Sequence, residues 1–189
     1  MKKILFTIIT AAIILTACAG STPPPIETVE EKIGNLTIQA PVGWEKTIDD
    51  SYDFWTCYTY MKSSKDNTGI ALLSVYIDKE VQESVSISDL DYQFEDDNDM
   101  VQIHFNDIND NFLGDKPIRI GHGTWQTNYQ GNIGPLFDLT KVSMFDADLR
   151  GITVEYMYLD EVADQGYSDY ANKLVDTMQL IYDYQYTTS

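Results

Sequence analysis

The sequence predicts an α+β domain, in which helices flank a central antiparallel β-sheet. Several segments rich in β-branched and aromatic residues alternate with a period of two, and short turn-forming segments join them. A strongly amphipathic helix follows the last of these segments. Neighbouring hairpins give antiparallel pairs, and an amphipathic helix needs a sheet face to cover. Hydrophobic residues make up 43% of the 189 residues, which is enough for one core.

The first predicted strand is GNLTIQAPVGW (34–44), where Leu36 and Ile38 alternate before a Pro-x-Gly-Trp turn. FWTCYTYM (54–61) and GIALLSVYI (69–77) have strand composition. SSKDNTG between them has the chemistry of a hairpin loop, so these two segments are expected to pair.

A short helix is predicted next, within SISDLDYQFEDD (86–97), because the alternation stops there. Ser88 is expected to cap this helix, with Leu90 and Phe94 on its inward face.

Four more strands are predicted after this helix. They are MVQIHF (100–105), KPIRIGHGTWQTNYQ (116–130, bent at Gly121 and Gly123), LFDLTKVSMF (136–145) and GITVEYMYL (151–159). GNIGP before the third is expected to be a turn, and DADLRG before the fourth a tight hairpin turn.

The final predicted element is a helix capped by Ser168. Its apolar stripe, Ala171, Leu174, Val175 and Met178, is expected to pack on one face of the sheet.

The N-terminus has the parts of a bacterial lipoprotein signal. Lys2 and Lys3 form a basic start, and residues 4–15 are apolar except for two threonines. At about 1.5 Å per residue, this run is too short for a ~30 Å bilayer core, which indicates a signal peptide rather than a span. Residues 15–18, LTAC, resemble the lipobox. That resemblance implies cleavage before Cys18 and attachment of a diacylglycerol to its thiol.

The predicted organisation therefore has three parts. Residues 1–17 are the lipoprotein signal peptide, 18–31 a lipidated Pro-rich tether without a fold of its own, and 32–189 a single domain. The expected location is the bacterial cell membrane, lipid-anchored and facing outside the cytoplasm. Lipidation at Cys18 would leave Cys57 without a disulfide partner.

The charge restricts the partners. The chain carries 12 basic and 30 acidic residues, for a formal charge of −18, and loss of the two lysines in residues 1–17 would give −20. Such a field repels phosphate backbones, so nucleic acid is not expected as a partner. Beyond the membrane anchor at Cys18, the expected partners are an envelope protein or a cationic ligand.

The Pro-x-Gly-Trp turn, the central strand pairs, GITVEYMYL and the closing helix YANKLVDTMQLI together resemble the PsbP/Mog1/DcrB-like group. The resemblance covers nearly all of the predicted domain in element order. It implies an α/β/α sandwich around an antiparallel sheet, and bacterial members include many small lipoproteins. It implies no chemistry, because a shared fold does not carry function, and no site residue is carried over from it.

No catalytic motif is recognisable, and no catalytic residue, metal ligand or cofactor is predicted. His104 and His122 do not have the spacing of a zinc site. Cys57 lies in a strand-like segment without a nearby histidine, which favours a structural role.

Acidic segments offer one alternative. EDDNDM (95–100), NDINDNFLGD (106–115) and DADLRG (146–151) are rich in oxygen ligands of the kind that Ca²⁺ binds. The EF-hand pattern fails, because a loop starting at Asp107 has Phe112 at its sixth position, where glycine is required. We therefore interpret these segments as solvated acidic loops.

Aromatic residues offer another alternative, since Trp44, Trp55 and Trp125 could line a groove for a glycan or peptide, although most aromatics are expected in the core. The leading hypothesis is a lipid-anchored, extracytoplasmic binding or assembly module without catalysis. The alternatives are a divalent-cation-binding envelope lipoprotein and an envelope hydrolase that uses His104 or His122 as general base.

Overall fold

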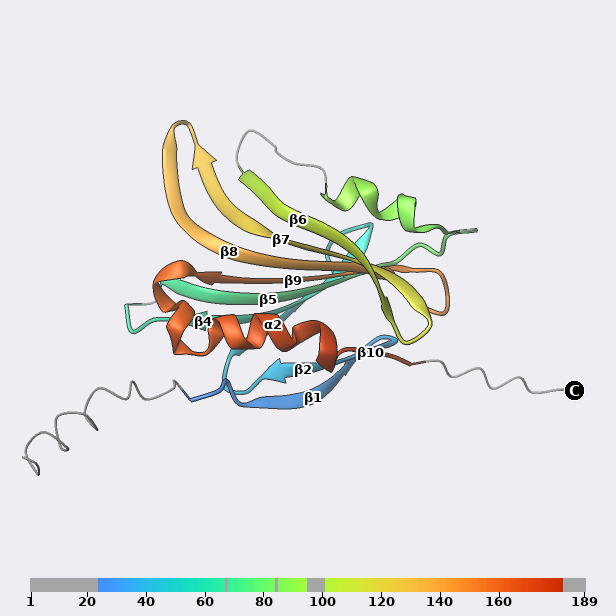
Figure 1. Cartoon of the computed structure of the whole chain (residues 1–189), viewed down its shortest axis with the longest axis horizontal. Helices are drawn as coiled ribbons and strands as arrows, with labels where there is room; N and C mark the ends of the chain where they lie inside the picture. The colour runs from blue at the N-terminus through green and yellow to red at the C-terminus, as the bar shows by residue number, and fades with distance from the viewer. Residues whose placement is uncertain (1–23, 67, 84, 95–100, 182–189) are drawn as a thin grey trace, which may run out of the picture.

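The computed structural model describes residues 24–66, 68–83, 85–94 and 101–181. These residues form two antiparallel β-sheets, one α-helix and two 3₁₀ helices (Figure 1).

The larger sheet has seven strands in the order β3-β4-β5-β9-β8-β7-β6, and every neighbouring pair is antiparallel. Its strands are β3 (Glu45–Asp49), β4 (Trp55–Ser63), β5 (Gly69–Asp78), β6 (Val101–Leu113), β7 (Lys116–Tyr129), β8 (Asn132–Phe145) and β9 (Gly151–Leu159). The predicted pairing of residues 54–61 with 69–77 is confirmed, as is the tight turn that joins β8 to β9.

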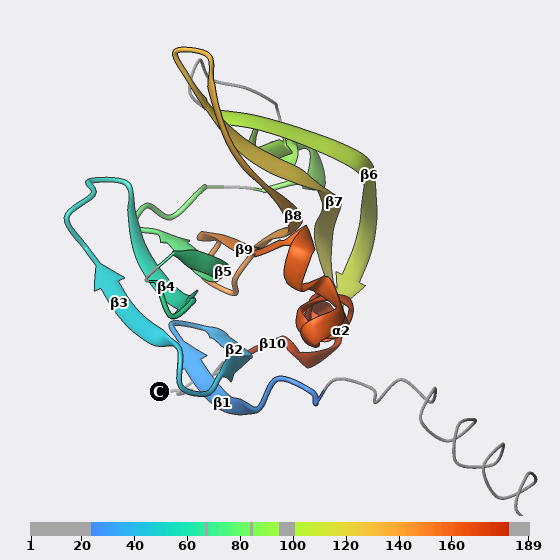
Figure 2. The same cartoon turned by 90° about the vertical axis from the view of Figure 1, so that its left-hand side faces the viewer.

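The smaller sheet has the order β1-β2-β10, with β1 (Thr28–Ile33), β2 (Leu36–Pro41) and β10 (Gln179–Leu180). It lies with the α-helix α2 (Tyr167–Thr177) on one side of the larger sheet (Figure 2). The core fills the space between these layers. Its fully buried members include Ile33, Leu36, Ile38, Leu73, Val75, Ile118, Val142, Met144, Ile152, Val154 and Leu174.

Helix α2 packs through most of the stripe that its sequence predicts, with Ala171 and Leu174 buried, but both of its ends differ: Met178 is its extended C-cap, and the next two residues of the predicted helix form β10. The helix starts at Tyr167, directly after Gly166, so Ser168 is its second residue and not its cap. Gly166 has a φ of 92°, and this left-handed conformation, which glycine adopts at little cost, turns the chain from the 3₁₀ helix η2 (Asp160–Gln165) into α2. Tyr170 donates a hydrogen bond of 2.7 Å to the Gln39 carbonyl and so ties α2 to β2.

The predicted helix after β5 is the 3₁₀ helix η1 (Ile87–Phe94). Leu90 and Phe94 are buried as predicted, but the cap is Ser86 rather than Ser88. The Asp89 side chain accepts hydrogen bonds from the backbone N–H and hydroxyl of Ser86, and the Asp89 N–H donates to the Ser86 carbonyl. This reciprocal pairing fixes the start of η1 two residues earlier than the sequence suggests.

The α/β/α sandwich with helices on both faces of the sheet is not what the structure shows. Within the described residues, α2 is the one α-helix, and a three-stranded sheet shares its side of the larger sheet. The short 3₁₀ helix η1 lies over β7 and β8 on the other side. The domain is a mostly antiparallel β-structure whose strands supply most of the core.

Three segments that were predicted as loops are strands. The last four residues of the predicted tether, 28–31, belong to β1, which pairs along its length with β2. The acidic segment from residue 106 to 113 continues β6 as far as Leu113, and residues 132–135 of the predicted GNIGP turn belong to β8. These segments are largely exposed on both faces, so they lack the alternation that marks a half-buried strand, and backbone pairing alone defines them.

The predicted bend at Gly121 and Gly123 coincides with an irregularity in the ladder. The register of β6 against β7 shifts between Phe105 and Asp107, opposite Gly123 and His122. A Cβ atom on Gly121 would lie 2.7 Å from the Phe105 ring and 2.8 Å from the Phe94 ring. Glycine is required here because η1 and β6 both press against this point of β7.

Candidate binding surface

The larger sheet has two unlike faces. Antiparallel partners lie on the same face, so the register assigns each strand residue to one side. We call the side that faces α2 the inner face and the opposite side the outer face. The inner face carries core residues such as Leu73, Val154 and Tyr156, whose ring lies 4.9 Å from that of Tyr170 in α2.

Two rows of polar residues cross the middle of the outer face from β4 to β8. One row consists of Cys57, Tyr76, Thr153 and Ser143, and the next consists of Thr59, Ser74, Glu155 and Lys141. Ser143 and Thr153 are buried and their hydroxyls lie 3.3 Å apart. Polar groups at such depth need partners, and these rows provide them for one another.

Lys141 and Glu155 form the charged centre of these rows. Lys141 Nζ lies 3.0 Å from Glu155 Oε1, and the two side chains are only 10% and 19% exposed. The ring of Phe94 from η1 covers the ammonium group at 5.7 Å. Removing two charges from water costs free energy, which two apolar residues at these positions would not cost.

An apolar hollow of about 180 Å³ lies beside the polar rows. Its wall contains Met61, Gly69, Ala71, Leu72, Trp125, Phe137 and Met157. Trp125 and Phe137 meet edge to face, with ring centroids 5.6 Å apart and an interplanar angle of 78°. Two aromatic rings set the shape of one side, and two methionines, whose flexible thioethers adapt to different shapes, line the other.

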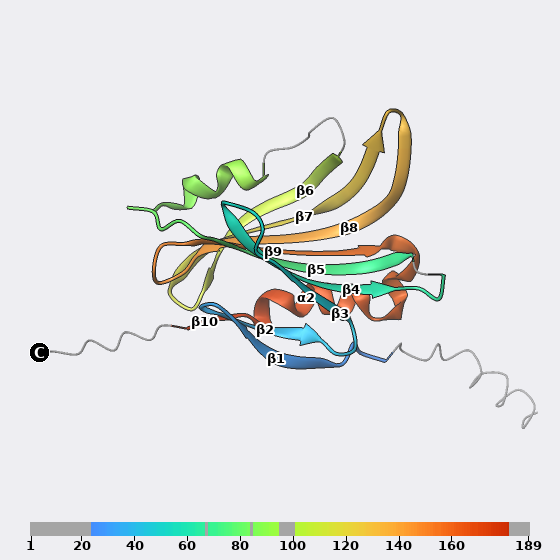
Figure 3. The same ribbon diagram turned by 180° about the vertical axis from the view of Figure 1, so that it is seen from behind.

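An aromatic cluster lies at the other end of the outer face. The Trp55 ring is 5.3 Å from Tyr52, 6.3 Å from Phe54 and 6.3 Å from Tyr76. Phe54 is 65% exposed, so the cluster presents an apolar tip to solvent. Figure 3 shows the loop between β3 and β4, which carries Tyr52 and Phe54, in front of the strands.

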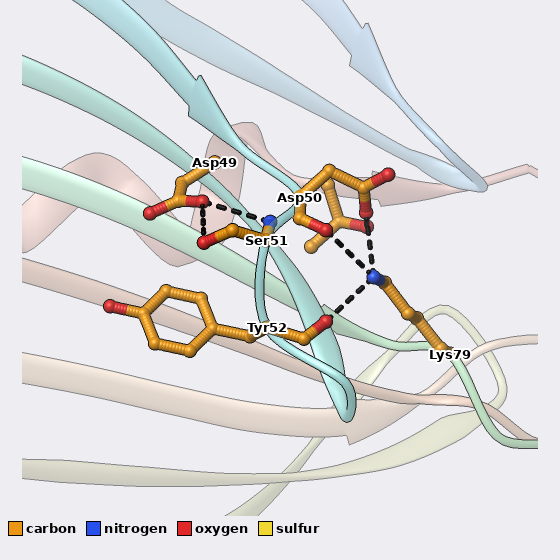
Figure 4. A network of polar contacts seen from close by, with 6 residues as sticks. Asp49, Asp50, Ser51, Tyr52 and Lys79 are labelled. Carbon is orange, nitrogen blue, oxygen red and sulfur yellow. Dashed lines mark hydrogen bonds and ion pairs between the residues drawn. The ribbon is translucent and has the colours of Figure 1, made fainter.

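Lys79 holds this loop in place. Its ammonium group donates hydrogen bonds to the carbonyl oxygens of Asp50 (2.9 Å) and Tyr52 (2.6 Å) and forms an ion pair with the Asp50 carboxylate (Figure 4). The Thr56 hydroxyl and Lys79 together lower the pKa of Asp50, and hydrogen bonds from Ser51 lower the pKa of Asp49. The exposed aromatic residues therefore stand on a fixed loop.

The three tryptophans do not line one groove. Trp44 belongs to the inner side, where it stacks on Tyr156 with centroids 6.3 Å apart. Trp55 and Trp125 share the outer face, but β5, β9 and β8 separate their strands, a lateral distance of about 19 Å at ~4.8 Å per strand. The predicted aromatic groove is thus two separate clusters on one face.

The residues considered for catalysis are not brought together. Cys57 is a free, buried thiol on the outer face, and burial raises its pKa. His122 lies on the inner face, where its Nδ1 is 3.2 Å from the hydroxyl of buried Thr140. A thiol with a raised pKa and a hydroxyl out of reach of solvent are both poor nucleophiles.

The acidic segments do not assemble a metal site among the described residues, where no group of three or more His, Cys, Asp or Glu is placed to hold an ion. In the β8–β9 turn, the Asp146 carboxylate accepts the N–H groups of Asp148 and Arg150 and the Asn35 amide. That carboxylate is committed to the turn, which borders a second hollow of about 300 Å³ beneath η1. Residues 95–100 lie outside the described part.

Cys18, the predicted lipid attachment site, also lies outside the described residues, as do the signal peptide and the first residues of the tether. Among the residues that the structure does describe, none of the helices has the length and apolar character needed to cross a membrane.

Two solved bacterial structures are similar in fold to this chain. The chain is similar to the cyanobacterial PsbP protein CyanoP of Synechocystis (10% identity, TM-score 0.55), with 86% of this chain and 96% of that one covered. It is also similar to LpqN of Mycobacterium tuberculosis, described as involved in cell envelope biogenesis (12% identity, TM-score 0.53, 83% and 92% covered). Neither a protein-family model nor a curated protein sequence matches it. The chain therefore has a PsbP-like domain, and at these identities the likeness concerns the fold alone.

Sequence reasoning named Trp55 and Trp125 but missed Met61, Leu72 and Met157 as one group. A signal was present in GITVEYMYL, where one face is entirely apolar and the other mixes Thr153 and Glu155 with Met157. When one side of a strand is apolar and the other side mixes polar and apolar residues, the mixed side predicts a sheet face with a polar part and an apolar part.

Proposed function

We propose that this chain is a lipid-anchored lipoprotein that works outside the cytoplasm as a non-catalytic binding or assembly module. The observation that carries the proposal is the apolar hollow on the outer face, with its aromatic wall of Trp125 and Phe137. Binding sites in proteins are concave, mostly apolar and rich in aromatic side chains. A hollow with these features, on a face without an assembled reactive group among the described residues, suits recognition rather than turnover.

The size and surroundings of the hollow indicate its ligand. About 180 Å³ accommodates one large apolar side chain or a short hydrocarbon segment rather than a whole cofactor. Glu45 lies in the same cross-strand row as Met61, at the open edge of the sheet, and the chain as a whole carries a charge of −18. An apolar anchor on a positively charged surface therefore complements this site best.

Two further points support an extracytoplasmic role. The sequence 15–18 fits a lipobox after a basic and apolar leader. LpqN, which shares the fold, is described as involved in cell envelope biogenesis. A lipid at Cys18 and the Pro-rich segment after it would hold the domain close to a membrane while leaving its faces accessible.

The anchor is tested by expressing the full chain and a Cys18→Ala variant in a bacterial host. The intact mass of the membrane-extracted protein is expected to show loss of residues 1–17 and addition of acyl chains. The variant is expected to lose the acyl mass and to leave the membrane fraction. An unmodified chain that retains residues 1–17 would contradict the anchor.

The binding surface is tested separately, by a photo-reactive amino acid placed at Leu72 in the hollow or, as a control, at Ile48. Ile48 is exposed and apolar but belongs to the opposite side of edge strand β3. Crosslinking in intact cells is expected to give a discrete adduct from position 72 alone, and Trp125→Ala is expected to abolish it. Equal adducts from both positions, or adducts that persist in the Trp125→Ala background, would sink the assignment of the hollow.

A further inference from the structure

Strand β6 forms an open edge of the larger sheet. It is 13 residues long and stands last in the strand order, so among the described residues β7 is its one neighbouring strand. Most of its side chains from Asn106 to Phe112 are exposed on both faces. A long edge strand presents a row of backbone donors and acceptors to which another strand can add.

The turn at the end of β6 shows which residues point outward. Gly114 and Asp115 form a two-residue turn between Leu113 and Lys116, and Gly114 has a φ of 65°. The two residues that flank such a turn form a hydrogen-bonded pair, and hydrogen-bonded and non-hydrogen-bonded pairs then alternate along the antiparallel ladder. Odd-numbered residues from Leu113 back to Asp107 therefore face β7, and Ile108, Asp110 and Phe112 direct their backbone groups to the open edge.

The outward donors are of two kinds. The N–H of Phe112 is taken by the side-chain oxygen of Asn111 at 2.8 Å. The N–H groups of Ile108 and Asp110 lie further from the turn, within the stretch from Asp107 to Leu113 where the pairing with β7 is continuous. A strand added here would begin its pairing at these two residues.

The two faces of this edge differ in chemistry. On the outer face, Ile108 is 45% and Phe112 67% exposed, with Asp110 between them in a bidentate contact with Arg119. On the inner face lie Asp107, Asn109 and Asn111, and the Asn109 amide donates to Asp107 at 2.7 Å. A strand that pairs with β6 would meet apolar side chains on one face and an acidic, amide-rich row on the other.

The charge of the edge limits which strand can add. Natural edge strands are commonly protected by lysine, proline or short length. The segment 101–113 contains none of Lys, Arg, Pro or Gly, and the charges it carries are Asp107 and Asp110. Arg119 pairs with Asp110, so Asp107 is the carboxylate available to a partner. In a chain with a net charge of −18, it repels a second copy of the same edge and attracts a basic strand.

We propose that the β6 edge accepts an extended strand from a basic partner protein, with lysine or arginine side chains over Asp107 and apolar side chains beside Ile108 and Phe112. The backbone supplies the pairing and the two faces set the register and the alternation of the partner. This surface is separate from the hollow, and it does not depend on the lipid anchor or on the proposed function.

The probe for this proposal is a nonapeptide of alternating lysine and valine, added to isotopically labelled protein. Backbone amide signals of Ile108 and Asp110 are expected to shift and their hydrogen exchange to slow by at least tenfold, while signals around Trp125 stay in place. Binding is expected to weaken severalfold between about 50 and 300 mM salt, as charge attraction requires. The matched peptide of alternating glutamate and valine is expected not to bind.

Three variants locate the contact. Ile108→Pro removes an outward N–H but no N–H that faces β7, so the fold is expected to survive and peptide affinity to fall at least tenfold. Ile108→Val keeps the N–H and the apolar contact and is expected to bind normally. Asp107→Lys is expected to abolish binding of the cationic peptide.

Three results would overturn the proposal. These are equal binding of the glutamate peptide, shifts confined to the hollow, and an unchanged affinity of a folded Ile108→Pro variant. Self-association of the full chain through β6, seen by sedimentation, would assign the edge to a second copy instead. Folding of each variant is checked by circular dichroism and thermal unfolding, and Ile108→Val and Asp107→Lys keep the test available if the proline variant does not fold.

Discussion

Lys141 on β8 and Glu155 on β9 form an ion pair of 3.0 Å in the middle of the outer face, where both side chains are largely shielded from water. They stand on neighbouring strands at directly opposed positions, so the register of β8 against β9 fixes their distance. A slip of one residue would turn one of the two charges into the apolar core on the inner face. The pair therefore favours this register of β8 against β9 and also forms part of the outer face.

Lys141→Met is expected to destabilise the domain by about 3 kcal/mol, because it leaves the Glu155 carboxylate without its partner in a poorly hydrated place. The double variant with Glu155→Met is expected to recover most of this loss, since no uncompensated charge remains. Urea unfolding of both single variants and the double variant measures the coupling between the two residues. Additive effects in this cycle would show that the pair contributes nothing specific.

Gly121→Ala is expected to destabilise the domain by about 1–3 kcal/mol, because its Cβ would lie within 2.8 Å of the Phe105 and Phe94 rings. The rings would have to move, which would also loosen η1. Gly69→Ala is the matched control, since the nearest atom to its Cβ would be the Met61 sulfur at an ordinary 3.8 Å. Thermal unfolding compares the two, and equal midpoints would contradict the close packing at Gly121.

Tyr60→Phe is expected to leave the stability unchanged or to raise it by about 1 kcal/mol. The Tyr60 hydroxyl is buried and has no hydrogen-bond partner among the described residues, so its removal relieves a desolvation cost. Burial also raises the pKa of this phenol to about 12. A loss of more than 1 kcal/mol on substitution, measured by denaturant unfolding, would show that the hydroxyl has a partner.

Cys57 is expected to react more slowly with alkylating reagents in the folded protein than in the unfolded chain, and to reach its full rate only at a higher pH, because burial raises the pKa of its thiol. This raised pKa also makes the free energy of unfolding depend on pH, because ionisation of a group whose pKa is raised by folding favours the unfolded chain. The stabilisation that the protonated Cys57 thiol gives the folded state is therefore complete below the pKa that the thiol has in the unfolded chain. It is lost as the pH rises through the pKa that the thiol has in the folded protein. Alkylation rates followed by mass spectrometry from pH 7 to 11, with the urea-unfolded chain as control, test this. Equal rates in both states at pH 8 would refute it.

Elements with a face of regularly spaced apolar core residues could be predicted from the sequence. Strand β9 and helix α2 are examples, because the spacing of Val154 and Tyr156 or of Ala171 and Leu174 records the face that packs. Strand β1 and the second half of β6 could not, since edge strands exposed on both faces are held by backbone hydrogen bonds, which leave no side-chain pattern.

The candidate site was less predictable than the fold. Trp125 and Met61 meet in the hollow because β9 lies between β5 and β8, which brings β4 and β7 onto one continuous face. No local pattern in Gly151–Leu159 states that it inserts between those two strands. The site depends on strand order, which long-range pairing sets.

The central position of β9 also dictates when the domain can close. This strand is the last of its sheet to leave the ribosome, yet it alone joins β3-β4-β5 to β6-β7-β8. Until it arrives, β5 and β8 would each lack the strand that pairs with their backbone groups in the folded domain. We therefore expect the larger sheet to close late, and we expect chains truncated before residue 151 to be degraded by quality-control proteases.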